Sequence, residues 1–256
     1  MNLFTRQFGA GQPVIILHGL FGLSDNWVTF GRQLGQNYSV YIPDLRNHGR
    51  SPHSKVFDFP SLENDILEMI ELNGLENIFL IGHSLGGKTA MLLALHHPDL
   101  VKKLVIVDIS MRKFAPDEEH QQLLNAMTAV DFSAAGSRSD VEKQLIAKIK
   151  STKIRQFLMK NVYWRDRYSL DWRLNLQAIN DNLLSIFEEI DVQGSYGGPV
   201  LFIRGGSSDY IRDADLADIK AKFPLSGVNT IANASHWIHA DAPGEFYSLV
   251  KNFLDK

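Results

Sequence analysis

Short apolar runs recur along the chain, and each is followed by a turn and then by a segment whose apolar residues have helical spacing. The runs cover residues 14–17, 40–43, 78–82, 104–107, 200–203 and 228–231. Continuous apolar runs of this length are typical of parallel strands that are covered on both faces. The alternation of strands and helices therefore predicts an α/β fold with a mostly parallel, doubly wound sheet.

One segment between two of these runs has clear helix signals. Apolar residues at positions 62, 66, 69 and 70 fall on one side of a helix, with Ser61 before them and Gly74 after them. Serine is a favoured N-cap, and glycine commonly ends a helix. We therefore expect a helix that is capped by Ser61 and ends at Gly74.

The strand rhythm is interrupted once, in what we call the 111–195 segment. It has no convincing strand, and helical patterns cover residues 117–129, 140–150 and 176–189. Connections longer than about 15 residues within a compact domain are usually functional. We expect a helical cap, inserted after the sixth strand, over an α/β core formed by residues 1–110 and 196–256. Four aromatic residues either line a pocket under this cap or form its own core: Tyr163, Trp164, Tyr168 and Trp172.

Composition and charge narrow the function classes. The chain has 256 residues, with 26 Lys and Arg against 29 Asp and Glu, and a net charge of -3. Its basic residues are scattered, whereas binding to nucleic acid or to an anionic membrane needs a basic patch. The absence of cysteine excludes disulfides, thiolate nucleophiles and cysteine-bound metals.

The N-terminal residues and the lengths of the apolar runs indicate the cellular location. The first 13 residues lack the apolar core of a secretory signal, and no apolar run reaches the length of a membrane span. We therefore expect a cytoplasmic protein with no membrane span and no nucleic-acid partner. The sequence does not indicate an oligomeric state.

Residues 79–90, FLIGHSLGGKTA, contain a nucleophile-elbow motif. In GxSxG the serine stands on a strained turn between a strand and a helix, where small neighbours allow the chain to fold tightly. This motif makes Ser84 the candidate nucleophile. The backbone N–H of Leu85 would then face the negatively charged oxygen that forms during acyl transfer.

The same residues also match GxxxxGK[ST], the phosphate-binding P-loop. In that motif backbone N–H groups surround the phosphates, Lys88 would reach the terminal ones, and Thr89 would contact magnesium. Asp108, at the end of an apolar run, would supply the acidic strand end of such an NTPase. A nucleotide-binding protein is therefore the competing hypothesis.

The rest of the chain favours the serine hydrolase. Such an enzyme needs an oxyanion loop after an early strand and a histidine near the C-terminus, in the order Ser, Asp, His. Residues 18–22, HGLFG, follow an early strand and would place the N–H of Leu20 beside that of Leu85. His236 follows the last expected strand and is the candidate base. A P-loop protein has no use for either feature.

Two aspartates are candidates for the acid that orients this histidine. Asp108 ends the strand after the nucleophile helix, whereas Asp209 lies in the loop after the next-to-last strand. Aligning Gly205 with the glycine that commonly begins this loop puts Ser208, and not Asp209, in the usual position of the acid. Because neighbouring parallel strands end at one edge of the sheet, we favour Asp108 and keep Asp209 as the alternative.

Other polar residues near these motifs have structural interpretations. His239 lies three residues after the candidate base, and we expect it to make a structural hydrogen bond. This pair of histidines lacks a third metal ligand, so we expect no metal. His18 and His48 are expected to be buried scaffold residues. Arg46 and Arg50 are expected to shape a loop, with contact to an acidic substrate group as the alternative.

With these motifs together, the chain resembles an α/β-hydrolase, and more narrowly the YbfF-type esterases and their mitochondrial α/β-hydrolase-domain relatives. The resemblance runs from residue 14 to residue 253 and is weakest in the 111–195 segment; its most specific parts are residues 82–93 and 235–241. In YbfF-type enzymes the triad is a serine at the elbow, an aspartate after the following strand and the first C-terminal histidine. The resemblance therefore implies the triad Ser84, Asp108 and His236.

The resemblance also implies a reaction. It implies hydrolysis of a small carboxylic ester, with acyl-thioesters as a further substrate class, and with no cofactor. Related dehalogenases and epoxide hydrolases use an aspartate nucleophile, which Ser84 excludes. Carbon–carbon bond hydrolases, perhydrolases and acyltransferases share the triad and remain alternatives, as does a receptor that binds a small ligand without turnover.

Overall fold

The computed structural model describes residues 1–114 and 118–256, and its large sheet has seven strands in the order β1-β3-β2-β4-β5-β8-β9. The strands of this sheet are β1 (Thr5–Phe8), β2 (Pro13–Leu17), β3 (Ser39–Pro43), β4 (Ile78–His83), β5 (Val101–Val107), β8 (Val200–Gly205) and β9 (Ser226–Ile231). β1 pairs antiparallel with β3, and the other neighbours are parallel. The predicted doubly wound, mostly parallel sheet is confirmed, and each of the six predicted strands is present.

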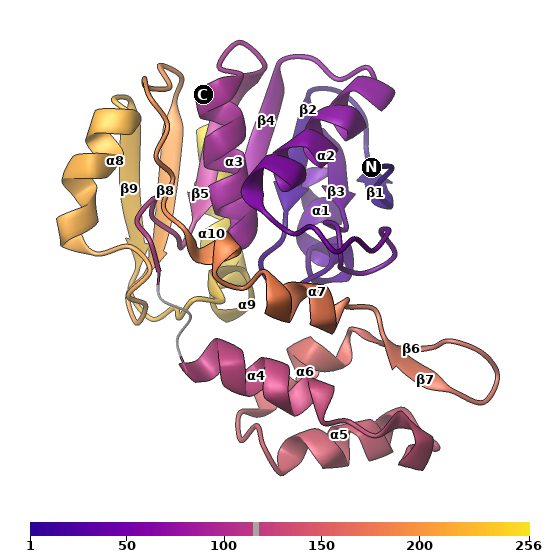
Figure 1. Cartoon of the computed structure of the whole chain (residues 1–256). Helices are drawn as coiled ribbons and strands as arrows, with labels where there is room; N and C mark the ends of the chain where they lie inside the picture. The colour runs from indigo at the N-terminus through magenta and orange to yellow at the C-terminus, as the bar shows by residue number, and fades with distance from the viewer. Residues whose placement is uncertain (115–117) are drawn as a thin grey trace.

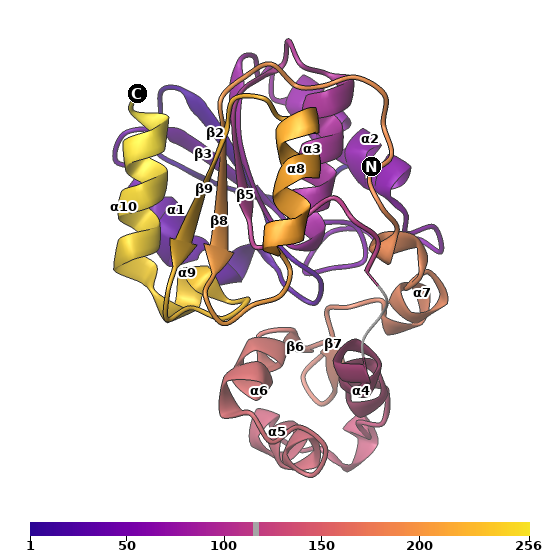
Figure 2. The ribbon, with the colours of Figure 1, turned by 90° about the vertical axis from the view of Figure 1, so that its left-hand side faces the viewer.

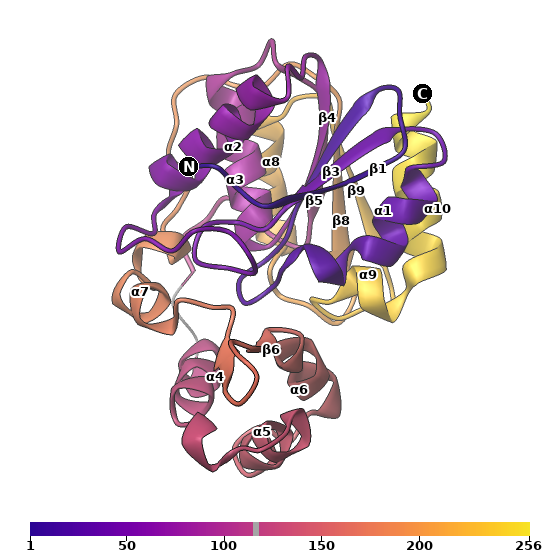
Figure 3. The same ribbon diagram turned by 90° about the vertical axis from the view of Figure 1, so that its right-hand side faces the viewer.

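Helices cover both faces of this sheet. The helices of the described residues are α1 (Val28–Leu34), α2 (Phe59–Leu72), α3 (Leu85–His96), α4 (Glu118–Thr128), α5 (Arg138–Ile146), α6 (Thr152–Met159), α7 (Leu176–Asp181), α8 (Leu216–Lys222), α9 (Ile238–Asp241) and α10 (Pro243–Leu254). Figure 2 shows α2, α3 and α8 on one face and α1 and α10 on the other, and Figure 3 shows the same layers from the opposite side. Each face has its own apolar core, and the core under α2 and α3 continues into the 111–195 segment.

The 111–195 segment has its helices α4, α5, α6 and α7 beyond the carboxyl ends of the parallel strands, below the sheet in Figure 1. It follows β5, the fifth strand of this chain, so the expected position after a sixth strand is wrong. β1 is the one strand before β2, and it forms an edge of the sheet by pairing with β3. The sequence pattern missed β1 because an edge strand is half exposed and needs no continuous apolar run.

The interior of the 111–195 segment differs in part from the expectation. The helices α4, α5 and α7 fall within or beside the expected ones, although Asp117 lies outside the described residues. The hairpin of β6 (Val162–Trp164) and β7 (Leu170–Trp172) was not expected, because three-residue strands are too short to show an alternating pattern. The helix expected over residues 176–189 ends at Asp181, where the amide of Asn182 donates to the Ala178 carbonyl, and a 3-10 turn (Ser185–Phe187) follows it.

The start of α2 also corrects the sequence analysis. The N-cap is Asp58 and not Ser61, because the Asp58 carboxylate accepts a hydrogen bond from the backbone N–H of Ser61 at 2.9 Å. Pro60 stands in the first turn, where its missing N–H has no helical partner to lose. The helix therefore begins three residues earlier than expected.

No helix within residues 1–114 and 118–256 has both the length and the apolar character needed to span a lipid bilayer.

Candidate active site

Ser84 stands at the junction of β4 and α3, on a strained backbone. Its φ of 53° lies in the left-handed region, which costs energy for a residue with a side chain. The turn is fixed because its N–H donates to the Val107 carbonyl of the neighbouring strand at 3.1 Å. Gly86 packs so closely that a Cβ there would meet the carbonyl oxygens of Leu17 and His18 at 2.5 and 2.6 Å. The GxSxG motif therefore forms the sharp strand-to-helix turn that the sequence predicts.

Asp108 and His236 are joined by a hydrogen bond. The His236 ring donates from Nδ1 to Oδ2 of Asp108 at 2.8 Å, since a carboxylate can only accept. Asp108 directly follows β5, has a φ of 50° and is 0% exposed. Its other acceptor positions are filled by the backbone N–H of Gly205 at 2.8 Å and by the hydroxyl of Ser208. Three donors therefore hold this carboxylate in place against the histidine ring.

Asp209 does not occupy this position. Its side chain is exposed, and its backbone carbonyl accepts a hydrogen bond from Arg112 at 2.8 Å. The preceding residue, Ser208, is the one that reaches Asp108. The geometry thus agrees with the alignment argument, which put Ser208 at the position where the acid of this loop usually stands.

Ser84 and His236 line the same cavity of about 70 Å³, together with His83 and Tyr210. The Tyr210 ring stacks on the His236 ring, with 4.0 Å between their centroids. On the other side, the His83 ring lies 4.7 Å from the His236 ring, and its Nε2 donates to the His236 carbonyl at 2.9 Å. Burial lowers the pKa of His83 well below its usual value, so this neighbour is uncharged.

His83 is the second residue of the GxSxG motif, a position that the motif leaves open to any residue type, so no role for it was predicted. Its position on β4 orients it toward the C-terminal histidine, which only the folded chain brings near. His83 helps to hold His236 in place, because its ring donates to the backbone carbonyl of His236 and packs against the His236 ring. The neutral ring of His83 adds no charge beside His236.

Leu20 and Leu85 lie beside Ser84 around a second, smaller cavity of about 20 Å³. Within the described parts of the chain, neither backbone N–H donates to a backbone carbonyl in a turn or loop. Leu85 is the first residue of α3, and the first N–H groups of a helix lack partners inside it. Both expected oxyanion donors thus border the cavities that contain the Ser84 hydroxyl.

His18 and His48 have the expected scaffold roles. The ring of His18 accepts from the Leu45 N–H at 2.9 Å, and the ring of His48 accepts from the Phe21 N–H at 3.2 Å. Burial lowers the pKa of His18 to about 4 and that of His48 to about 3, so both rings are neutral near pH 7. Together they fix the loop that carries Leu20.

The two arginines of the loop after β3 also have protein partners. Arg46 donates to both carboxylate oxygens of the buried Asp65, at 2.6 and 2.8 Å. Arg50 lies 3.5 Å from Asp25 and over the ring of Phe4. Their structural interpretation is supported by these contacts.

His239 does not make the structural hydrogen bond that we expected. Its Nδ1 has no hydrogen-bond partner among the described residues, and its ring stacks on that of Trp27 at 4.2 Å. Burial lowers the pKa of His239 to about 3. The short helix α9 turns this ring away from Asp108, so the first histidine, His236, receives the carboxylate.

The three residues required by the P-loop hypothesis are engaged elsewhere. The Lys88 ammonium donates to backbone carbonyls at the ends of the 111–195 segment, including that of Arg112 at 2.9 Å. Thr89 donates its hydroxyl to the carbonyl of Leu85 within the same helix at 3.0 Å. Asp108 holds His236. This arrangement leaves none of the three facing a phosphate site.

Aromatic residues do line the cavities, but they are not the four that the sequence suggested. Trp164 and Tyr168 are 48% and 80% exposed, and Trp172 packs inside the segment with its indole N–H on the Met127 carbonyl. The Phe, Tyr and Trp residues that line them are Phe21, Phe114, Phe157, Phe187, Tyr210 and Trp237. They come from several elements far apart in the chain, so local spacing could not identify them.

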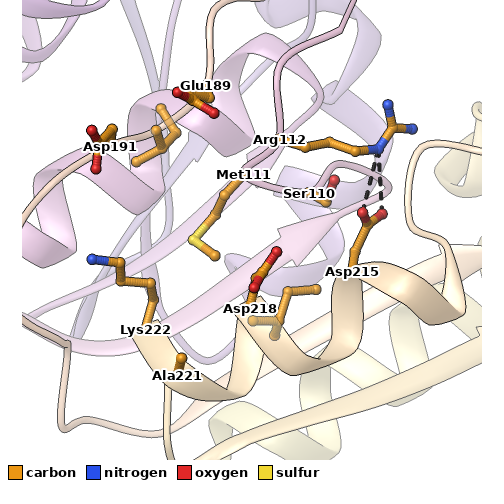
Figure 4. Close-up of a pocket in the computed structure, with 11 residues that line it drawn as sticks. Ser110, Met111, Arg112, Glu189, Asp191, Asp215, Asp218, Ala221 and Lys222 are labelled. Carbon is orange, nitrogen blue, oxygen red and sulfur yellow. Dashed lines mark hydrogen bonds and ion pairs between the residues drawn. The ribbon is translucent and has the colours of Figure 1, made fainter.

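A larger pocket of about 350 Å³ lies apart from these cavities, between α8 and the two connections that join the 111–195 segment to the sheet. Figure 4 shows Arg112 facing Asp215 at one side of the pocket, with Glu189 and Asp191 at the other side. The Arg112 guanidinium lies 3.4 Å from the Asp215 carboxylate. In the described parts of the chain, no group of three or more His, Asp or Glu side chains is arranged to hold a metal ion.

Comparisons with known proteins identify the fold family of this chain. The family described as "alpha/beta hydrolase fold" matches residues 12–243. The chain is 37% identical to the sn-1-specific diacylglycerol lipase ABHD11 of Xenopus laevis, over 96% of this chain and 80% of the relative. It is 30% identical to the esterase YbfF of Escherichia coli (strain K12), over 95% and 93% of the two chains. Among solved structures, a marine microorganism esterase has a TM-score of 0.95 and 39% identity, covering 98% of both chains.

Proposed function

The chain belongs to the α/β-hydrolase fold family, and on that premise we propose that it is a serine hydrolase that cleaves carboxylic esters. The observation that carries the proposal is the hydrogen bond between Asp108 and His236 in a site that also contains Ser84 on its strained turn. Serine is inert at its own pKa and needs a histidine to take its proton and an acid to orient that histidine. These three side chains have the residue types and the chain order that this chemistry requires.

In the proposed mechanism, the Ser84 oxygen attacks the ester carbonyl while its proton passes to Nε2 of His236. The carbonyl oxygen becomes negatively charged and accepts hydrogen bonds from the N–H groups of Leu20 and Leu85. The intermediate collapses to an acyl-serine, and the alcohol leaves with the proton from His236. Water then attacks the acyl-serine with His236 again as base, which releases the acid and restores Ser84.

Asp108 supports this cycle without itself becoming protonated. Its carboxylate keeps the Nδ1–H of His236 on the far side of the ring, so that Nε2 is free to accept a proton. The charge of Asp108 also stabilises the imidazolium that forms in each half of the reaction. The two donors from Gly205 and Ser208 prevent the carboxylate from turning away.

We also propose that residues 111–195 act as a cap over this site, on a core of residues 1–110 and 196–256. The segment contributes His120, Leu123, Ile154 and Phe157 to the cavity of about 70 Å³ beside His236. Pockets for small ligands usually measure about 300–1,000 Å³, so an ester needs the cap to move before it can bind. The apolar lining favours an uncharged acyl chain.

The names of the relatives support an ester as the substrate, since one is a diacylglycerol lipase and two are esterases. Acyl-thioesters are a further class that the same chemistry would cleave. Carbon–carbon bond cleavage, perhydrolysis, acyl transfer to an alcohol and ligand binding without turnover use the same fold and remain the alternatives.

A substrate panel with a nucleophile variant tests the proposal. The purified protein and Ser84→Ala are incubated with p-nitrophenyl esters and acyl-CoAs of increasing chain length. We expect turnover that falls by about 10⁴-fold or more in the variant, with its melting temperature retained. Equal turnover in both proteins would remove Ser84 from the mechanism. Absence of turnover, together with no labelling by a fluorophosphonate probe, would favour a binding protein.

A further inference from the structure

Lys88 is a buried cation that the proposed chemistry does not use. It lies in α3, one helical turn after Ser84, and is 2% exposed. It borders the cavity of about 20 Å³ that also contains Ser84. Burying an ammonium is costly unless its three N–H groups have acceptors. The Lys88 ammonium must therefore find hydrogen-bond acceptors inside the protein.

The acceptors are backbone carbonyls. The ammonium donates to the carbonyl of Arg112 at 2.9 Å and to that of Glu188, and the carbonyl of Phe187 lies 3.5 Å away. The ring of Phe114 lies 5.0 Å from the ammonium and offers it a favourable aromatic face. No carboxylate pairs with this ammonium among the described residues.

These carbonyls belong to the two connections of the 111–195 segment. Arg112 lies on the outgoing connection, residues 108–114, and Glu188 lies on the returning connection, residues 186–192. The connections run side by side, because the N–H of Phe114 donates to the Phe187 carbonyl and the N–H of Ile190 to the Met111 carbonyl, both at 2.8 Å. Lys88 is thus bonded to both ends of the segment at once.

The same connections carry the side chains that enclose Ser84. Phe114 comes from the outgoing connection, and Ile186 and Phe187 come from the returning one; all three line the cavity next to Ser84 and Lys88. The position of these apolar side chains therefore depends on how the connections are held against α3. An unbranched apolar side chain in place of Lys88 would fill the space without holding them.

We propose that Lys88 is a positioning residue that ties both connections of the 111–195 segment to the nucleophile helix and so holds the apolar wall of the substrate site over Ser84. This inference rests on the proposed esterase function. The Lys88 ammonium donates to carbonyls of the two connections and to no triad side chain among the described residues, and it acts through Phe114, Ile186 and Phe187. Its effect therefore falls on substrate binding more than on the chemical step.

The first test is Lys88→Met, which keeps the length and removes the donors. With the longest p-nitrophenyl ester that the wild type hydrolyses, we expect KM to rise about tenfold or more while kcat falls less than about threefold. The matched control is Lys103→Met. Lys103 also donates to backbone carbonyls, of Phe253 and Leu254, and lies over an aromatic ring, but it lines neither cavity beside Ser84. The control should keep both constants.

A second test separates the charge from the shape. Because the chain has no cysteine, Lys88→Cys has a single thiol that can be alkylated in urea before refolding. Alkylation with 2-bromoethylamine restores an ammonium at the original reach, and 1-bromopropane gives a neutral group of the same size. We expect the aminoethyl protein to recover a low KM and the propyl protein to behave like Lys88→Met. Equal recovery by both would overturn the proposal.

The pH dependence of KM is a further readout. Burial and the nearby Arg112 lower the pKa of Lys88 to about 7, opposed by Glu188 and Glu189. Below that pH the ammonium has three donors, and above it the amine has two, so one carbonyl loses its partner. KM for the longer ester should therefore rise above about pH 7 in the wild type and not in Lys88→Met. His120 of α4 lines the same cavity and is present in both proteins.

Hydrogen exchange tests the tie without any substrate. The amides of Phe114 and Ile190 hold the two connections together, so they should exchange about tenfold faster in Lys88→Met than in Lys103→Met. Unchanged exchange with unchanged KM would refute the positioning role. Faster exchange in a protein that hydrolyses no ester would instead leave the tie standing and overturn the esterase proposal.

Discussion

Asp108→Asn gives the sharpest test of the triad because it changes one atom in a fully described environment. Three donors converge on the carboxylate: the Gly205 N–H, the Ser208 hydroxyl and the Nδ1–H of His236. An amide has one oxygen to accept with. If that oxygen stays on Gly205, the NH₂ group faces His236 and forces Nδ1 to become an acceptor.

The expected loss of kcat in Asp108→Asn follows from the change in the tautomer of His236. Once Nδ1 accepts, Nε2 carries the proton and cannot take one from Ser84. A wrong tautomer in a serine triad costs about 10⁴-fold in kcat, which corresponds to about 5 kcal/mol of transition-state free energy. The backbone should stay in place, because asparagine is among the residues that best tolerate the positive φ of this position. Unfolding in urea should show a loss of only about 1–3 kcal/mol.

The assay is kcat for a p-nitrophenyl ester, with active sites counted by a fluorophosphonate probe. Asp209→Asn is the matched control, since Asp209 is exposed and the carboxylate bonded to the His236 ring is that of Asp108. We expect the control to stay within about twofold of the wild type, as surface substitutions usually do. Activity of Asp108→Asn within tenfold of the wild type, or an equal loss in Asp209→Asn, would refute the assignment of the acid.

Two further predictions concern stability. His18 and His48 are neutral in the folded chain, with pKa values of about 4 and about 3, and they take up protons near pH 6.5 when the chain unfolds. The unfolded state thus binds more protons, and lowering the pH from 6.5 to 5.5 should cost about 1 kcal/mol per histidine in urea unfolding; a flat profile would contradict this reading. Gly86→Ala should lower the free energy of unfolding by about 1–3 kcal/mol, because its Cβ would meet two backbone carbonyls at 2.5 and 2.6 Å. Gly227→Ala is its control, because nothing lies within 4 Å of that Cβ, and equal melting temperatures for the two variants would argue against the tight packing of the elbow.

Much of the fold was predictable from local pattern. Buried parallel strands are apolar on both faces, so each of the six predicted strands contains a continuous run of apolar residues. Such a run can be recognised without knowing which strands lie beside it. The elbow is equally local, because its strain is borne by Ser84 and relieved by the small residues around it. The edge strand β1 and the short hairpin of β6 and β7 escaped prediction because their stability comes from pairing partners and not from their own residues.

The sequence by itself determined the architecture, the position of Ser84, and the set of residues from which the acid and base had to come. Only the tertiary structure decided among them. His236 and His239 are three residues apart, and the turn into α9 directs one ring to Asp108 and stacks the other on Trp27. Asp108, and not Asp209, is placed to orient His236, because β5 ends between β4 and β8. This position buries the Asp108 carboxylate among three donors. The contacts of Lys88 could not be predicted from the sequence for the same physical reason. Its acceptors lie 24 and 100 residues away along the chain, and they come together only where the 111–195 segment returns to the sheet.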